Sequence, residues 1–115
     1  MSLKVVSTTF DCLDPDGLAK WWADGLGGEV NPVVPGEFVQ VSLPDGPNLA
    51  FQRVPDPTPG KNRVHLDLGA DDMEAEVARL VGLGAQVTAR NSFGDEFHWV
   101  VLADPAGNAF CIATE

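Results

Sequence analysis

The 115-residue sequence predicts an α+β fold made of two tandem β-α-β-β-β modules, and three observations support this prediction. The residues around Asp45 recur around Asp104, 59 positions later (104 − 45), and six of the fourteen residues from 38 to 51 are identical at that offset, against about one expected from average composition. Each half opens with an apolar, β-branched segment typical of a strand, and helical periodicity follows it. Each half is too short to bury a sufficient core alone, so we expect a single domain.

The repeat and one proline-rich stretch set the predicted boundaries. The first module covers about residues 3–54, the second about residues 63–115, and both belong to one domain over residues 1–115. Residues 55–62 join them and begin with three prolines in five positions. Proline cannot donate a backbone hydrogen bond to a sheet, so this stretch is predicted to be a semi-rigid linker.

Four strands are predicted in each module. The second hairpin of each module closes across a turn rich in Asp, Pro, Gly and Asn, at residues 44–47 and 104–108. The predicted strands are residues 5–10, 29–33, 37–43 and 48–54 in the first module, and residues 64–68, 86–92, 96–103 and 109–114 in the second.

A helix follows the first strand of each module. Asp14 is the predicted N-cap of the first helix, with Pro15 at its first position. Asp71 is the predicted N-cap of the second helix, Glu74 stands where a capping-box acid would, and Gly84 marks the end. The residues predicted to face the core are Leu18, Trp22 and Leu26 in the first helix and Met73, Val77 and Leu80 in the second.

The second module carries two extra residues. The predicted helix caps repeat at an offset of 57 (71 − 14), whereas the hairpins repeat at an offset of 59. We place the two extra residues in a loop at about residues 91–95, where the pattern of the second module is most polar.

Composition limits the partners and the compartment. Seventeen acidic against seven basic residues give a formal charge of −10, which repels phosphate backbones and anionic lipid, so we expect no nucleic-acid or membrane partner. No apolar run approaches the roughly 20 residues that span a bilayer, and no export signal is apparent at the N-terminus, so a cytoplasmic location is predicted. Cys12 and Cys111 are the only cysteines, and we expect both to be reduced.

Several segments together resemble a known superfamily. Asp-Pro-Ala-Gly-Asn at residues 104–108 precedes the last strand of the doubled unit, and it is accompanied by Asp-Cys-Leu-Asp-Pro at residues 11–15 and Val-His-Leu-Asp-Leu at residues 64–68. Nearly the whole chain is similar to the vicinal oxygen chelate superfamily, which includes glyoxalase I, bleomycin-resistance proteins and extradiol dioxygenases, and more narrowly to its bacterial glyoxalase-like domain group. The resemblance implies a cupped mixed β-sheet with helices outside, a small ligand or metal in the cup, and a homodimer.

The resemblance also implies where a metal would bind. Enzymes of the superfamily take ligands, usually His and Glu, from the first and last strands of each module. These positions correspond here to His65, to Gln52 and Cys111 at matching places in the repeat, and to either Ser7 or Thr8. Of these, only His65 is a good ligand for a catalytic divalent ion, and neither Gln52 nor neutral Cys111 is a base. We therefore expect no catalytic metal, the alternative being Zn, Fe, Mn or Ni held by His65, Cys111 and Gln52.

His65 is the candidate catalytic residue, as a metal ligand or as a general base, and simple packing in the strand explains it equally well. Asp67 lies two residues further along the same face, either as a proton partner of His65 or as a charge at the rim of the sheet. Cys111 would need an activating base to act as a nucleophile, and a small buried hydrophobe is the simpler interpretation.

Six side chains are predicted to contact a ligand. Strand alternation sends His98 and Trp99 to opposite faces, and we favour Trp99 as the pocket residue. Trp21 and Trp22 are adjacent on a helix, so one packs inward and the other lies near a rim or an interface. The predicted ligand-binding residues are Trp99, Gln52, Cys111, Gln40, Phe38 and Trp22.

Two function classes follow from these residues. The first is a metal-free protein that binds a small molecule in the cup of its sheet, similar to the bleomycin-resistance branch. The second is a metal-dependent lyase, isomerase or dioxygenase that uses His65 as a ligand. A module that serves only protein interaction is a third possibility, which a cup filled by its own side chains would favour.

Overall fold

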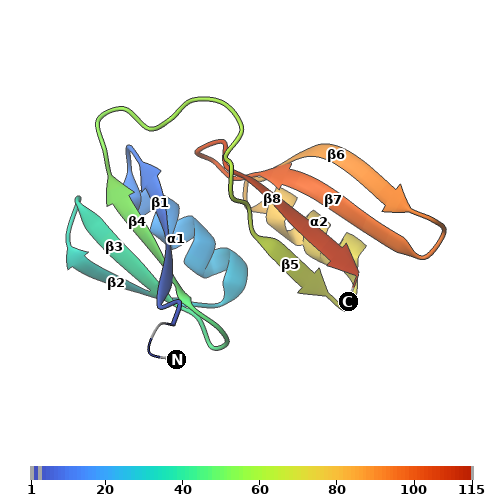
Figure 1. The fold of residues 1–115 in the computed structure, drawn as a ribbon, viewed down its shortest axis with the longest axis horizontal. Helices are drawn as coiled ribbons and strands as arrows, with labels where there is room; N and C mark the ends of the chain where they lie inside the picture. The colour runs from blue at the N-terminus through green and yellow to red at the C-terminus, as the bar shows by residue number, and fades with distance from the viewer. Residues whose placement is uncertain (1, 3, 115) are drawn as a thin grey trace. The chain divides into compact units, whose positions relative to one another are not determined.

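Each half of the chain forms its own β-α-β-β-β unit, with a four-stranded mixed sheet and one helix against one face of that sheet (Figure 1). The structure is a computed structural model that describes residues 2 and 4–114. The chain divides into two compact units at residues 57 and 58. Residues 3 and 115, where the modules were predicted to begin and end, lie outside the described residues.

The first unit contains the strands β1 (Ser7–Cys12), β2 (Glu29–Val34), β3 (Phe38–Ser42) and β4 (Asn48–Arg53) and the helix α1 (Pro15–Leu26). The strand order in its sheet is β1-β4-β3-β2. β1 runs parallel to β4, and the other pairs are antiparallel. β1, the first strand of the unit, therefore lies at one edge of the sheet, next to the last strand, β4, in its interior.

The second unit repeats this arrangement with β5 (Asp67–Ala70), α2 (Met73–Gly82), β6 (Gln86–Phe93), β7 (Phe97–Ala103) and β8 (Ala109–Thr114). Its strand order is β5-β8-β7-β6, and β5 runs parallel to β8. The same order and the same strand directions confirm the tandem modules predicted from the repeat. Within the part of the chain that the structure describes, each helix is too short and too polar to span a membrane.

In the first unit the core lies between α1 and one face of the sheet. Val39 and Val41 of β3 are fully buried. Trp22 of α1 is 1% exposed, and its ring centroid lies 5.7 Å from that of Phe10, which stacks on Phe51 at 5.1 Å. Trp22 and Phe51 are the largest fully buried side chains of the unit, and burial of apolar area is the dominant stabilising contribution in folding.

The second unit packs the equivalent face of its sheet against α2. Burial alternates along β7 from Trp99 to Ala103, where Val100 and Leu102 are buried and their neighbours are half-buried, as expected for a sheet covered on one face only. The buried residues of this core include Val77 and Leu80 from the helix and Val100, Leu102, Phe110 and Ile112 from the sheet.

The helix starts confirm one predicted cap and correct the other. The Asp14 side chain accepts a hydrogen bond from the N–H of Gly17 at 3.1 Å, and Pro15 opens the helix as predicted. In α2 the N-cap is Asp72, which accepts from the N–H of Ala75 at 3.1 Å, so the prediction of Asp71 is wrong by one residue. The reason is the turn from strand to helix, which places one residue between the strand end and the cap in both units.

The observed helix caps repeat at an offset of 58 (72 − 14), so the second module carries one extra residue between cap and hairpin, not the two predicted. The added length lies in a strand. β6 has eight residues and β2 has six, whereas the hairpin turns at residues 35–37 and 94–96 have equal lengths. The predicted strand over residues 86–92 extends by one residue, and residues 91–93, in the stretch where we placed the extra residues, are paired with β7. Backbone pairing in an antiparallel hairpin satisfies their N–H and C=O groups, which a loop would leave to water.

β5 begins three residues later than predicted, at Asp67 and not at residue 64. The side chain of Asn62 takes the place of backbone pairing in that stretch. Its Oδ1 accepts from the N–H of Ala109 at 2.7 Å, and its Nδ2 donates to the carbonyls of Val64 and Ala109. Regular pairing starts just beyond, where the N–H of Cys111 donates to the Leu66 carbonyl at 2.9 Å.

Asp104 and Asp45 are equivalent in the repeat, yet only Asp104 is buried, at 4% exposure. Its Oδ1 accepts from the N–H groups of Ala106 and Asn108 at 2.9 and 2.8 Å. Its Oδ2 accepts from the Asn108 side chain at 2.9 Å. The carboxylate of Asp104 thus holds the turn between β7 and β8 together.

Asp104→Ala is expected to lower the free energy of unfolding by about 1–3 kcal/mol, because it leaves partly buried N–H groups without their acceptor. Asp45→Ala, at the exposed equivalent position, is the matched control and is expected to change it by less than about 0.5 kcal/mol. Urea unfolding of both variants measures the difference. Equal effects at the two positions would contradict a structural role for the Asp104 carboxylate.

Candidate functional site

The face of each sheet that carries no helix holds most of the predicted ligand-binding residues. In the first unit, Phe38 and Gln40 are the half-buried residues of β3, alternating with the buried valines that face α1. Phe38 is paired with Gln52 of β4, so these three side chains share the helix-free face of the sheet.

The parallel pairing aligns the two modules residue by residue. Gln52 is paired with Asp11, and its equivalent Cys111 is paired with Asp67. Asp11 and Asp67 are therefore equivalent, and the residues two places before them are Thr9 and His65.

The position equivalent to His65 is thus Thr9, not Ser7 or Thr8 as predicted. Thr8 is paired with the buried Leu49 and faces α1. The correction arises because the first strands repeat at an offset of 56 (67 − 11) and the last strands at 59 (111 − 52), a difference that the sequence repeat does not show.

In the second unit, His65, Asp67 and Cys111 come together. The Nε2 of His65 lies 3.2 Å from Oδ1 of Asp67, and the donor atoms of all three side chains lie within 4.8 Å of one another. Two residues apart, His65 and Asp67 project to the same side of the chain, and the parallel pairing sets Cys111 beside Asp67. Of the three predicted metal ligands, the structure brings His65 and Cys111 together, while Gln52 lies on the sheet of the first unit.

The Cys111 thiol is held in its neutral form. Burial raises its pKa above the ordinary value, and the negative charge of Asp67 raises the pKa further, against a smaller opposing effect of Lys61. A hydrogen bond between the thiol and the Asp67 side chain adds to the rise in pKa. Cys111 is therefore a poor nucleophile at neutral pH, because the thiolate is the reactive form.

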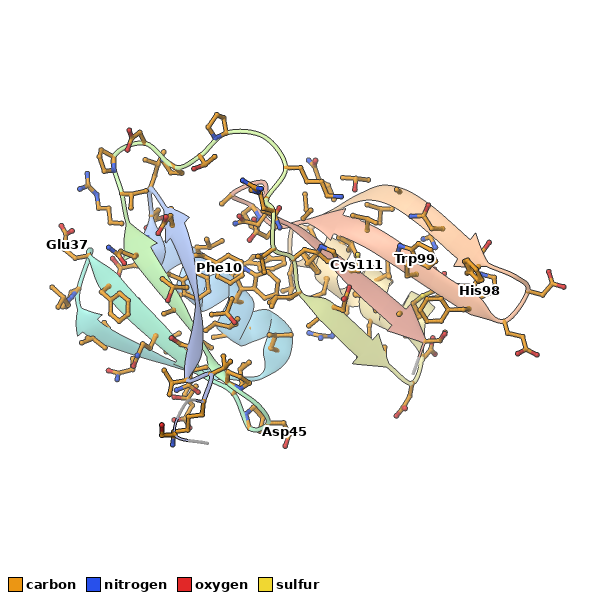
Figure 2. All side chains as sticks on the ribbon, viewed as in Figure 1. Phe10, Glu37, Asp45, His98, Trp99 and Cys111 are labelled. Carbon is orange, nitrogen blue, oxygen red and sulfur yellow. The ribbon has the colours of Figure 1, made fainter. Side chains whose placement is uncertain are left out.

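Trp99 lies on the same helix-free face as Cys111. It is paired with Ala113 of β8, two residues along from Cys111, and its ring centroid lies 5.5 Å from that of Phe97. Its neighbour His98 belongs to the opposite face, where Nε2 lies 3.0 Å from the Asp95 carbonyl. Figure 2 labels these two residues on β7 and Cys111 on β8.

Small residues flank the indole on this face. Trp99 is paired with Ala113, and Ala113 is paired in turn with Gly69 of β5. Neither residue carries a bulky side chain. On its other side, Trp99 is paired with Asn91 of β6.

Trp22 is not on this kind of face. It is 1% exposed and belongs to the core between α1 and the first sheet, so it offers no surface to a ligand. Trp21, its half-buried neighbour, meets it edge-on at 5.2 Å. The sequence predicted that one of the two packs inward, and the structure identifies that residue as Trp22.

The donor set of the second unit fits a divalent ion, whereas that of the first does not. Imidazole, carboxylate and thiolate are all zinc ligands. The equivalent residues Thr9, Asp11 and Gln52 contain a single strong donor, the Asp11 carboxylate. Asp67 was predicted only as a proton partner or rim charge. The signal that identifies it as a third donor is its pairing with Cys111, which follows from aligning the first and last strands of the module.

Solved structures similar to this chain share its whole fold. A glyoxalase/bleomycin resistance protein/dioxygenase family enzyme from Burkholderia phytofirmans PsJN superposes with a TM-score of 0.83 at 15% identity, covering 97% of this chain and 98% of that one. Lactoylglutathione lyase from Agrobacterium tumefaciens gives 0.73 at 18% identity, covering 99% and 95%. A superfamily member from Sphaerobacter thermophilus DSM 20745 gives 0.74 at 22% identity, covering 98% of each chain. Comparison with curated proteins gives no match.

The tandem modules and the match of the glyoxalase-like domain family to residues 7–113 define the class of protein, the vicinal oxygen chelate superfamily. That match covers nearly the whole chain, and the chain belongs to the glyoxalase-like domain family. Both parts of the resemblance seen in the sequence are thereby confirmed.

Asp67→Asn is expected to lower the pKa of the Cys111 thiol, because the substitution removes a negative charge that disfavours the thiolate. Alkylation by iodoacetamide should then reach half its maximal rate at a lower pH. The measurement uses a Cys12→Ala background, so that Cys111 is the only thiol. An unchanged or higher midpoint would contradict the effect assigned to Asp67.

Proposed function

We propose that this chain binds a small molecule with a flat ring on the helix-free face of its second sheet, without chemical turnover. The observation that carries this proposal is Trp99, a half-buried indole beside Phe97, whose row continues on the β8 side with the small residues Ala113 and Gly69. A single large aromatic next to small residues is a good stacking surface, because the ring of the ligand replaces water against both.

The first sheet supports the same function with different chemistry. Phe38, Gln40 and Gln52 offer an aromatic ring and two amides on its helix-free face. Gln40 and Trp99 are equivalent in the repeat, so the two modules present a hydrogen-bonding group and a stacking group at matching places. Binding without turnover agrees with the neutral form of the Cys111 thiol, because the thiolate is the reactive form.

A metal-dependent lyase, isomerase or dioxygenase is the second candidate, and the cluster of His65, Asp67 and Cys111 favours it. A divalent ion held there would polarise oxygen atoms of a bound substrate. In that case His65 is the catalytic position, as one of the ligands of the ion. The first candidate is preferred because, among the described residues, the equivalent positions Thr9, Asp11 and Gln52 of the first module contain only one strong donor.

Trp99→Leu is expected to weaken binding of a flat aromatic probe by about ten-fold, the effect of losing one stacking contact. Metal-free bleomycin and ethidium are suitable probes, with affinity measured by isothermal titration calorimetry. Trp21→Leu, on α1, is the matched control and should leave the affinity unchanged. Binding by neither probe, or equal losses in both variants, would overturn the proposed site, and loss of binding on adding a chelator would favour the metal-dependent candidate.

We also propose that the chain acts as a homodimer in the cytoplasm, without nucleic-acid or membrane partners. Support for a dimer comes from Val33 and Val34 of the edge strand β2, which are 51% and 50% exposed and form an apolar edge. Sedimentation equilibrium should give twice the chain mass of 12.2 kDa. A mass equal to one chain at micromolar concentration would contradict this.

A further inference from the structure

We propose that the second module alone binds a thiophilic divalent cation, best matched by Zn²⁺, through His65, Asp67 and Cys111. This site differs from the arrangement that the resemblance implies, in which first and last strands of both modules converge on one ion. It includes Asp67, and it needs no residue of the first module. It also stands independently of the stacking surface at Trp99.

The positions of the three donors support this site. Their donor atoms lie within 4.8 Å of one another, and Nε2 of His65 lies 3.2 Å from Oδ1 of Asp67. Ligand atoms on a tetrahedral zinc ion lie roughly 3.4–3.7 Å apart, given the usual zinc–ligand distances. Small side-chain rotations therefore bring all three donors to one ion.

The backbone keeps these donors in place. Asp67 and Cys111 are partners in the parallel ladder, and the N–H of Cys111 donates to the carbonyl of Leu66, the residue between His65 and Asp67. The hydrogen bonds of Asn62 to Val64 and Ala109 fix the chain just before His65. Asp67 and Cys111 lie on paired strands, and His65 lies two residues before β5 in a stretch held by these hydrogen bonds. A backbone fixed in this way holds ligands more accurately than a free loop does.

The donor chemistry selects the ion. A thiolate and an imidazole favour zinc and similar borderline ions over magnesium, calcium or manganese. Three protein ligands leave the fourth tetrahedral position to water or to a donor atom of a ligand. Binding displaces the proton of the Cys111 thiol to solvent, and the exposed side chains of His65 and Asp67 give the ion a route in.

Cobalt provides a direct test, because Co²⁺ in such a site shows a thiolate-to-cobalt absorption band in the near ultraviolet. The wild-type protein should show this band, and Cys111→Ala should abolish it. Cys12→Ala is the matched control, since Cys12 is the other buried cysteine and lies on β1 of the first unit. Absence of the band in the wild type, or its loss in Cys12→Ala, would overturn the proposal.

Zinc affinity, measured by competition with a chromophoric chelator, tests each ligand separately. His65→Ala and Asp67→Asn are expected to weaken binding by more than about 100-fold, beyond the effect of losing an outer-shell partner. His98→Ala, the other histidine, and Gln52→Ala should bind as the wild type does. A large loss in Gln52→Ala would instead indicate a site shared between the modules, and wild-type affinity in Asp67→Asn would remove Asp67 as a ligand; either result refutes the single-module site.

Circular dichroism of every variant shows whether it folds, and Cys111→Ser replaces Cys111→Ala if the latter does not. Trp99→Leu should retain wild-type zinc affinity. If Trp99→Leu loses binding of the aromatic probes, the conclusion about the metal site is unaffected, so the two proposals are tested separately.

Discussion

The parallel pairing of the first and last strands within each module is the constraint on which the rest depends. It brings Asp67 next to Cys111 and Asp11 next to Gln52, although about 40 residues of helix and hairpin lie between them in each case. The helix in the connection between these two parallel strands covers one face of the sheet, because a parallel connection must cross over the sheet. The opposite face is left for the side chains that distinguish the two modules.

The two modules share one backbone arrangement but carry different side chains at equivalent positions. Asp11 and Asp67 stand at equivalent places, but their neighbours are Thr9 and Gln52 in one module and His65 and Cys111 in the other. One sheet therefore offers neutral hydrogen-bonding groups, and the other offers groups that titrate or bind cations. The middle strands continue this contrast. β3 carries Phe38 and Gln40, whereas β7 carries Phe97 and Trp99 at the equivalent positions.

Local patterns in the sequence predicted most of the fold. The Asp14 cap, the Pro15 start and the β8 bounds follow from short-range chemistry, and the structure reproduces them. The start of β5 depends on the tertiary hydrogen bonds of Asn62, which no local pattern reveals. The Asp72 cap and the length of β6 depend on where the paired strands end, which the repeat in the sequence does not fix. The site shows the same division. His65 and Cys111 were predicted from motif positions, whereas the role of Asp67 required the register between strands 44 residues apart (111 − 67).

The side chain of Asn62 has one further consequence. Because its amide joins the end of the linker to Ala109 and Val64, the chain downstream of Asn62 is anchored to β8 before the second sheet begins. A change of length among residues 55–61 is absorbed before this anchor and leaves the spacing between His65 and Cys111 intact. The same change between Asn62 and His65 would shift the imidazole along the strand edge. Residues 55–61 of the linker therefore tolerate variation in length, whereas the stretch from Asn62 to His65 does not.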